Sequence, residues 1–431
     1  MTSIKSITAR RVWDSRGQPT VEADVILDNG EMGRAIAPAG ASRGKREAID
    51  LRDGGSRLRG KDISQALSAI NTVIAPALNG LDIQDQAALD AAIIALDPSA
   101  MKEKLGGNAT VAVSLALLHA AAADQKKPLW RHVADVYDQT PSLPLPEIQV
   151  FGGGAHAGRR VDVQDFMIMV PGASNFDEVM EITSEIYFAA GDIMASRGHL
   201  MGVADEGGWW PEFNSNEQAL ETLVMAIEKA GEKPGDRVVI SLDVAASEFG
   251  EKDHYRLALE DRKLSSEHWI EMLGQWLDAY PIVSIEDPVS EDDVPAMIEF
   301  TRRFGERVQI IGDDYLVSNT SLVDQAAADG ACNAVLIKVN QIGTVSEAVS
   351  TYHAARKANW GTVVSARSGE TEDVSISHLA TGLGSAQLKV GSFQRSERMV
   401  KWNECLRIQD ELGADQFVGG APLANTWWAK Q

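Results

Sequence analysis

The chain has 431 residues, and its 40 Lys and Arg against 62 Asp and Glu give a formal net charge of −22 at pH 7. A continuous basic surface that binds nucleic acid or an anionic membrane is therefore not expected, and an anionic substrate needs cations concentrated at one site. The apolar share of 44% and the charged share of 24% are those of an ordinary globular protein, which excludes a disordered chain.

Neither a membrane span nor an export signal is expected. The longest apolar stretch, 111–123, contains Ser114 and His119 and is shorter than the roughly 20 residues that a bilayer requires. Residues 1–11 lack a long apolar segment followed by a small-residue cleavage site. Two cysteines, Cys332 and Cys405, are too few for a disulfide framework, so we expect buried thiols in a cytoplasmic protein.

The first part of the chain predicts a small α+β domain. Alternating apolar residues from Val21 to Leu27, followed by an Asp-Asn-Gly turn, indicate an antiparallel sheet within the first forty residues. Helical spacing follows from about residue 61 to residue 135. A Pro-bearing stretch, 141–146, then marks a boundary, because repeated Pro interrupts both helix and strand pairing. We therefore predict a capping domain over residues 1–138.

Beyond this boundary, short apolar or β-branched runs alternate with helical segments. The expected strands are 166–170, 238–242, 282–285, 308–311, 335–339 and 362–365. Strand, helix, strand is typical of a βαβ unit. We predict that residues 139–431 form a C-terminal β/α barrel of the TIM type.

Charged side chains fall at or near the ends of several runs, at Asp243, Glu286, Asp313, Lys338, Arg367 and Lys389. In a (β/α)₈ barrel the C-terminal strand ends converge on one mouth, so these side chains are expected to share one site. Three carboxylates there, Asp243, Glu286 and Asp313, suit Mg²⁺, which prefers oxygen ligands. The alternative is that each acid caps a helix or pairs with an arginine.

Three further residues are candidates for chemistry. Lys338 ends an apolar run, where burial and neighbouring cations are expected to lower its pKa and make it a base; a lysine whose stem packs while its head reaches solvent is the alternative. Glu206 lies in a glycine turn beside two tryptophans, which suits a general acid. Ser42 lies in a Gly-rich loop that can close over the mouth.

These residues lie in motifs that resemble the enolase family over nearly the whole chain, from Arg10 to Leu412. The motifs are Asp14-Ser-Arg-Gly with Pro19-Thr-Val-Glu22, Asp205-Glu-Gly-Gly208, Ser284-Ile-Glu-Asp-Pro288, Lys338-Val-Asn-Gln-Ile-Gly343 and Arg367-Ser-Gly-Glu-Thr-Glu-Asp373. The resemblance implies an α+β domain followed by a β/α barrel, two Mg²⁺ ions, the second arriving with the substrate, and a homodimer or larger homo-oligomer.

The resemblance also implies roles. Lys338 removes the proton α to a carboxylate, and Glu206 assists the loss of hydroxide. Asp243, Glu286 and Asp313 hold the first Mg²⁺, and Ser42 is a ligand of the second. His156, Gln164, Arg367, Ser368 and Lys389 contact a small anionic substrate, which is 2-phosphoglycerate in this family.

Several positions depart from the family pattern. Ala366 stands where the family has His before the Arg-Ser-Gly motif, Asp165 stands where the family has a catalytic Glu on the second barrel strand, and Arg43 stands where the mobile loop has Thr. The loop after His156 also carries Arg159 and Arg160. If the missing imidazole made one charge-assisted hydrogen bond, about 1.5–3 kcal/mol is lost, which corresponds to about 10- to 100-fold in rate.

These departures leave three readings of the activity open. The chain is a hydro-lyase acting on 2-phosphoglycerate, or a paralogue for a bulkier, more anionic analogue that binds Arg43, as in the carboxyphosphonoenolpyruvate synthases of phosphonate biosynthesis. The third reading is a binding scaffold without catalysis. A racemase or acid-sugar dehydratase is disfavoured because the second barrel strand, Phe166 to Val170, has no lysine.

Overall fold

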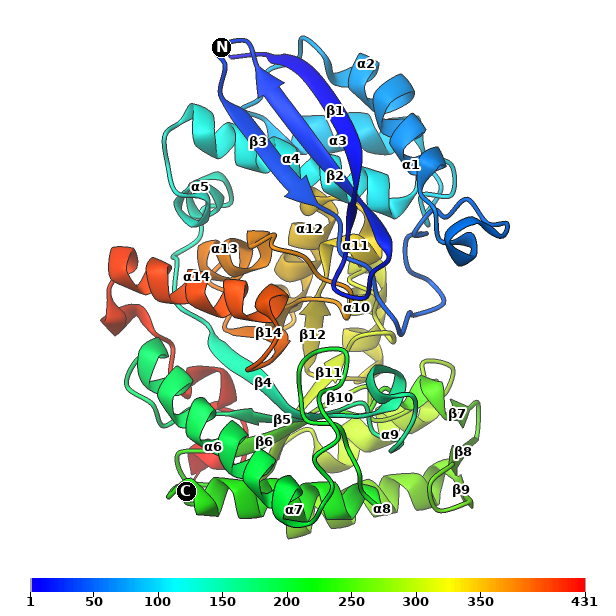
Figure 1. The fold of residues 1–431 in the computed structure, drawn as a ribbon, viewed down its shortest axis with the longest axis vertical. Helices are drawn as coiled ribbons and strands as arrows, with labels where there is room; N and C mark the ends of the chain where they lie inside the picture. Colours follow the sequence, from blue (N-terminus) through cyan, green and yellow to red (C-terminus); the bar gives the residue numbers. More distant parts are fainter. Residues whose placement is uncertain (1, 431) are drawn as a thin grey trace.

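The computed structural model describes residues 2–430 and contains two parts, a helix-backed sheet above a barrel in the view of Figure 1. The upper part begins with the antiparallel sheet β1 (Ile4–Trp13), β2 (Pro19–Leu27) and β3 (Met32–Ile36). The apolar face of β2 packs on helix α4 (Gly107–Asp124). On the other face Glu22 and Asp24 pair with Arg10 and Arg34, so even the polar positions of β2 are buried.

Helices form the rest of the N-terminal part: η1 (Arg57–Gly60), α1 (Ser64–Ala69), η2 (Ile70–Ile74), α2 (Ala75–Leu78), α3 (Gln86–Leu96), α4 and α5 (Leu129–Val136). The Ala-rich α4 is almost entirely buried, because it lies between the sheet and barrel helices α11 (Val339–Ile342) and α12 (Val345–Lys357). Gly33 permits this close contact, since a β-carbon there would collide with the backbone at Ala116 and Ala120. The predicted α+β fold of the N-terminal part is confirmed.

The predicted barrel is also confirmed. Its closed strand order is β10-β11-β12-β13-β14-β4-β5-β6. The strands are β4 (Leu145–Gly152), β5 (Asp165–Met169), β6 (Val239–Asp243), β10 (Ile282–Glu286), β11 (Gln309–Gly312), β12 (Ala334–Ile337), β13 (Gly361–Ser365) and β14 (Gln387–Ser392). The remaining helices are η3 (Gly154–Ala157), α6 (Phe176–Ser196), α7 (Asn216–Lys229), η4 (Ala246–Glu248), α8 (Ser266–Ala279), α9 (Val294–Phe304), α10 (Thr320–Asp329), α11, α12, α13 (Ser375–Gly382), α14 (Ser396–Leu412), η5 (Ala414–Gln416), η6 (Ala421–Leu423) and η7 (Trp428–Lys430).

Two parts of the barrel differ from the sequence-based prediction. The Pro-bearing stretch 141–146 was expected to interrupt strand pairing, yet strand β4 begins at Leu145 and carries Pro146, which lies opposite Leu388 of β14. The boundary proposed between residues 138 and 139 falls between α5 and β4. A small hairpin sheet, β7 (Gly250–Glu251), β8 (His254–Leu257) and β9 (Arg262–Ser265), follows η4 and was not expected.

The second barrel strand runs against the others. Strand β5 pairs antiparallel with both β4 and β6, whereas the βαβ units predicted from the sequence have parallel strands. The segment between β4 and β5, residues 153–164, contains only the short helix η3, and without a long crossover helix the chain returns in the opposite direction. Consequently the first residue of β5, Asp165, lies beside Asp243, the last residue of β6, at the mouth where the parallel strands end.

The opposite end of the barrel is closed by the C-terminal segment. Leu423 packs on Leu145, Met169, Val239 and Val283, near the other strand ends. The indole of Trp427 donates a hydrogen bond to the carbonyl of Ile282. The C-terminal segment therefore covers the end of the barrel opposite the mouth beneath the N-terminal part. Within residues 2–430 we find no helix with the length and apolar character of a membrane span.

Candidate active site

A small cavity lies at the barrel mouth and is lined by both parts of the chain. Residues 40–42 of the N-terminal part form one wall, and the barrel supplies His156, Gln164, Asp165, Glu206, Asp243, Lys338, Ser365, Ala366, Arg367, Ser368, Lys389 and Val390. All but three of the predicted catalytic, substrate-binding and metal-binding residues line this cavity. Of the three, Glu286 and Asp313 contact the cavity residues Lys389 and Lys338, and Arg43 lies outside.

Lys389 lies at the centre of the acidic side chains. Its Nζ is 2.7 Å from Oδ2 of Asp243, 2.7 Å from Oε2 of Glu286 and 3.6 Å from Oδ2 of Asp165. Burial lowers the pKa of Lys389, but these carboxylates outweigh it and raise the pKa well above its usual value. Lys389 is therefore a fixed positive charge within the cavity.

Lys338 is paired with the third predicted metal ligand. Its Nζ donates to Oδ2 of Asp313 at 2.6 Å. Burial lowers the pKa of Lys338, yet Asp313 and Glu286 outweigh burial and the cations Arg367 and Lys389, so the pKa is raised. The lowered pKa expected from the sequence is wrong for this arrangement, because the sequence pattern did not show a carboxylate in direct contact with the amine.

The acids fit a divalent cation. Burial and the Asp243 carboxylate raise the pKa of Glu286 well above its usual range. Oε1 of Glu286 and Oε1 of Gln164 are buried without a hydrogen-bond partner among residues 2–430. Such orphaned acceptors are costly unless a positive group meets them. Oxygen donors from Asp243, Glu286 and Asp313 are the chemistry that Mg²⁺ prefers. Among the described residues, ligand atoms lie within 4.8 Å of one another in two groups, Asp287 with Asp313 and Asp314, and His156 with Asp165 and Glu206; the predicted set of Asp243, Glu286 and Asp313 is not one of them.

His156 joins two carboxylates at the edge of the cavity. Its Nδ1 lies 2.9 Å from Oδ1 of Asp165, and its Nε2 lies 3.7 Å from Oε1 of Glu206. Burial lowers the pKa of His156, but the two carboxylates outweigh it and raise the pKa to about 9. Gln149 also donates to Asp165. The groups that contact Glu206 are therefore charged. Trp209, one of the two tryptophans near Glu206 in the sequence, stacks on Tyr187.

The anion-binding candidates lie under the loop that carries Ser42. Nη2 of Arg367 donates to the carbonyl of Ser42 at 3.0 Å, and Oγ of Ser368 accepts from the backbone amide of Ala41 at 2.6 Å. Gly40 is required here, because a β-carbon would collide with the guanidinium of Arg367. Ser42 therefore lies over the cavity with its carbonyl held by the barrel.

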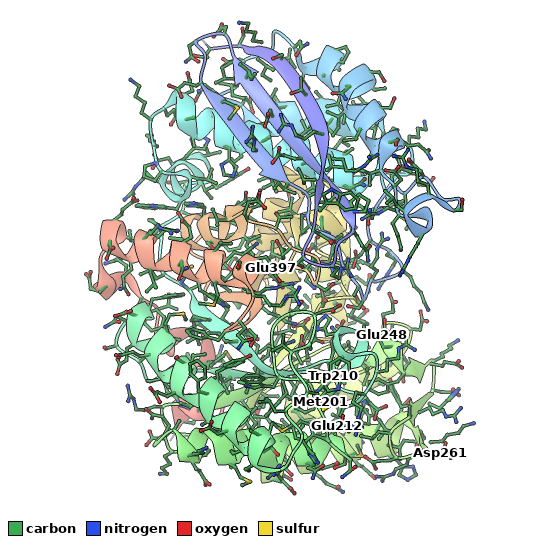
Figure 2. All side chains as sticks on the ribbon, in the orientation of Figure 1. Met201, Trp210, Glu212, Glu248, Asp261 and Glu397 are labelled. Atoms are coloured by element: carbon green, nitrogen blue, oxygen red, sulfur yellow. The ribbon has the colours of Figure 1, made fainter. Side chains whose placement is uncertain are left out.

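The three additional arginines do not line the cavity in this structure. Arg43 donates to the carbonyl of Ala48 at 3.1 Å, and its side chain is 37% exposed. Arg159 pairs with Glu248 at 2.6 Å, and Arg160 pairs with Glu212 at 2.8 Å. In Figure 2, Glu212 and Trp210 lie on the loop before α7, in front of the barrel. The proposed contact between Arg43 and substrate remains a prediction.

Ala366 forms part of the wall between the cations. It follows β13, its amide donates to the carbonyl of Lys389 at 2.8 Å, and its side chain is 6% exposed. At the position where the resembling family has a histidine imidazole, Ala366 therefore presents only a methyl group.

Three residues that position this site were not singled out from the sequence. Both carboxylate oxygens of Asp287 accept backbone amides, from Asp313 and Asp314, and so shape the turn that presents Asp313. The fully buried Arg398 donates to the carbonyls of Arg367, Ser368 and Val390. Glu47 pairs with Arg367. Glu47 and Arg398 bind partners far away in the sequence, so no local pattern indicates them.

The cavity joins a lysine, buried acids and anion-binding cations between an α+β part and a barrel. Two family models match the chain over these parts: "Enolase, N-terminal domain" over residues 4–133 and "Enolase, C-terminal TIM barrel domain" over residues 140–426. Together they span most of the sequence, including every cavity residue. The chain therefore belongs to the enolase family.

Proposed function

We propose that the protein is a Mg²⁺-dependent hydro-lyase that removes the proton α to a carboxylate and eliminates water to give an enolpyruvate product. The observation that supports this most is that Lys338 and Glu206, a base and an acid from distant segments, line one cavity together with Lys389 and Arg367. A small anionic substrate bound there meets two cations on one wall and an amine within reach.

In the proposed reaction, Lys338 in its neutral form accepts the proton from the carbon next to the carboxylate. Glu206 donates a proton to the departing hydroxyl, so the carbon–oxygen bond breaks, a carbon–carbon double bond forms and water leaves. Lys389 offsets the negative charge that develops on the carboxylate oxygens. The hydrogen bond between His156 and Asp165 holds the imidazole beside Glu206.

Two Mg²⁺ ions, the second arriving with the substrate, complete this proposal. Asp243, Glu286 and Asp313 would hold the first, and Ser42 would contribute to the second. When bound, the metal stabilises the doubly charged carboxylate of the intermediate. Neutralising Asp313 in this way also removes the main cause that raises the pKa of Lys338, which favours the neutral amine.

The substrate that we propose first is 2-phosphoglycerate, with a bulkier, more anionic analogue as the second candidate. The observation that favours the second is Ala366, whose methyl group lines the cavity between Arg367 and Lys389. A carboxylated phosphorus group, as in phosphonate biosynthesis, would use that space. A turn of the Arg43 side chain from the carbonyl of Ala48 toward the mouth would bring a third cation to it.

We also propose a homo-oligomer in the cytoplasm. The groove at the β1–β2 turn exposes Trp13 and Leu58 beside Arg59 and Lys61. Exposed apolar side chains that gather at one place are typical of interaction sites, and a second copy of a chain with net charge −22 complements these cations. Light scattering should give a dimer or larger species, and Trp13→Glu should shift it toward monomer. Free, buried Cys332 and Cys405 suit a reducing compartment.

The experiment that tests the activity supplies Mg²⁺ with 2-phosphoglycerate or a carboxyphosphono analogue and follows formation of the enolpyruvate product. Turnover of either compound supports the proposal and identifies the substrate. Magnesium binding with turnover of neither compound would instead support the binding scaffold.

A further inference from the structure

The loop of residues 39–48 is fastened to the barrel along its whole length. Ala39 and Gly369 exchange two backbone hydrogen bonds, at 2.9 and 2.8 Å. Ala41 and Ser42 bond to Ser368 and Arg367 in the middle of the loop. The amide of Ala48 donates to the carbonyl of Gln341 at 2.7 Å. The loop that carries Ser42 is therefore closed over the cavity.

Glu47 is the buried carboxylate that secures the far end of this loop. Oε2 accepts from Nη1 of Arg367 at 2.9 Å, and Oε1 accepts from Nη2 at 3.1 Å, which is a two-point pair. Both side chains are almost fully buried, at 2% and 3% exposure. Oε1 also accepts from the amide of Gly44 at 3.1 Å and from Nε2 of Gln341 at 3.3 Å.

The hydrogen bonds of Arg367 restrict how it can meet a ligand. A guanidinium has five N–H groups. Nη1 donates to Glu47 and to Oδ1 of Asn340, and Nη2 donates to Glu47 and to the carbonyl of Ser42. These four bonds leave the Nε–H and the charge for a bound anion. With Gly40 packed against it, the guanidinium cannot rotate unless the loop moves.

We propose that Glu47 is a positioning residue that couples closure of the 39–48 loop to the binding of an anionic group at Arg367. The inference rests on the proposed function in that the anion is taken to be the substrate's. Glu47 and the anion both bind the guanidinium of Arg367. Once one of them has restricted the movement of this side chain, the other loses less conformational entropy when it binds. Such coupling is reciprocal: the anion stabilises the closed loop, and the closed loop strengthens anion binding.

The same carboxylate is also connected to the base through two residues, Gln341 and Asp313. Gln341 donates to Oε1 of Glu47 and, at 2.8 Å, to Oδ1 of Asp313, whose other oxygen accepts from Lys338. Loop closure and the carboxylate beside Lys338 are thus connected through a single amide group.

Limited proteolysis tests the coupling without turnover. The loop carries three exposed trypsin sites, Arg43, Lys45 and Arg46, and cleavage there produces new N-termini at residues 44, 46 and 47 that mass spectrometry identifies. Cleavage in such a loop follows the population of its open form. Inorganic phosphate serves as the anion. Glu248→Gln is the matched control, because Glu248 also pairs with an arginine, Arg159, but on another loop.

We expect phosphate to slow cleavage of the loop in the wild type and in Glu248→Gln. In Glu47→Gln, cleavage without phosphate should be about 10- to 100-fold faster, the effect of losing one charge-assisted contact, and phosphate should protect much less. Cleavage of Glu47→Gln at the wild-type rate, or undiminished protection by phosphate, would overturn the inference. If Glu47→Gln does not fold, Glu47→Asp, which keeps the charge but shortens the pair, takes its place with the same criteria.

Kinetics separate this inference from the proposed function. With 2-phosphoglycerate, Glu47→Gln should raise KM more than it lowers kcat. A general loss of structure would instead lower the fraction of active enzyme and the thermal stability of the protein. Phosphate protection that depends on Glu47 in a protein without turnover contradicts the proposed function and leaves the coupling standing. Turnover with proteolysis indifferent to Glu47 contradicts the coupling alone.

Discussion

Nζ of Lys338 lies 2.6 Å from Oδ2 of Asp313, so the proposed base is in direct contact with a proposed metal ligand. The pair joins the ends of β11 and β12, 25 residues apart. In the proposed reaction this amine is the acceptor of the substrate's proton, which makes its removal the most direct test of the mechanism.

Lys338→Ala should abolish hydrogen–deuterium exchange at C2 of 2-phosphoglycerate in D₂O with Mg²⁺. The expected loss is about 10²- to 10⁴-fold, the usual contribution of a general base. NMR of the substrate measures the exchange directly. Lys252→Ala, at an exposed turn, is the control and should exchange at the wild-type rate. Exchange that survives in Lys338→Ala would remove Lys338 as the base.

The sequence pattern could predict a site residue only where that residue stands at the end of an apolar run that forms a barrel strand. Asp243 and Glu286 are the last residues of β6 and β10, so the end of each apolar run identified them. Asp165 begins its strand, and only the antiparallel direction of β5 brings it to the same mouth. Periodicity does not reveal strand direction, so the resemblance to a family, and not the pattern, indicated Asp165.

Long-range ion pairs were the least predictable part of the site. Glu47 and Arg367 are 320 residues apart, and their pairing depends on how the two parts of the chain pack. For the same reason the pKa of Lys338 was predicted in the wrong direction, because the approach of Asp313 is a tertiary contact.

Ala366→His distinguishes the two candidate substrates. If 2-phosphoglycerate is the substrate and an imidazole is missing, the variant should turn it over about 10- to 100-fold faster, the value of one charge-assisted hydrogen bond. Ala366→Leu fills the same space without a hydrogen bond and should bring no gain. High wild-type activity that His does not improve would remove the reason for proposing a larger substrate.

Magnesium should stabilise the protein through Glu286. At a concentration of 100 Kd, a ligand that binds only the folded state adds about 2.7 kcal/mol. Thermal unfolding of metal-stripped protein should therefore shift upward with Mg²⁺, and Glu286→Gln should lose most of the shift. Glu147→Gln is the control: Glu147 is equally buried but bonds to Ser241 and Gln387 and is not one of the proposed metal ligands. An equal shift in both variants would exclude Glu286 as a ligand.

His156 should remain protonated well above neutral pH. Its pKa of about 9 lies above the ordinary 6.5 because the carboxylates of Asp165 and Glu206 outweigh the effect of burial. A pKa raised by folding means that this interaction stabilises the protein fully below pH 6.5, and that the contribution is lost as the pH rises through about 9. NMR titration of the imidazole should show a midpoint near that value, and Asp165→Asn should lower it, since Asp165 is the carboxylate that bonds to the ring. A wild-type midpoint near 6.5, or one that Asp165→Asn leaves in place, would mean that the Asp165 carboxylate does not hold the imidazole in its charged form.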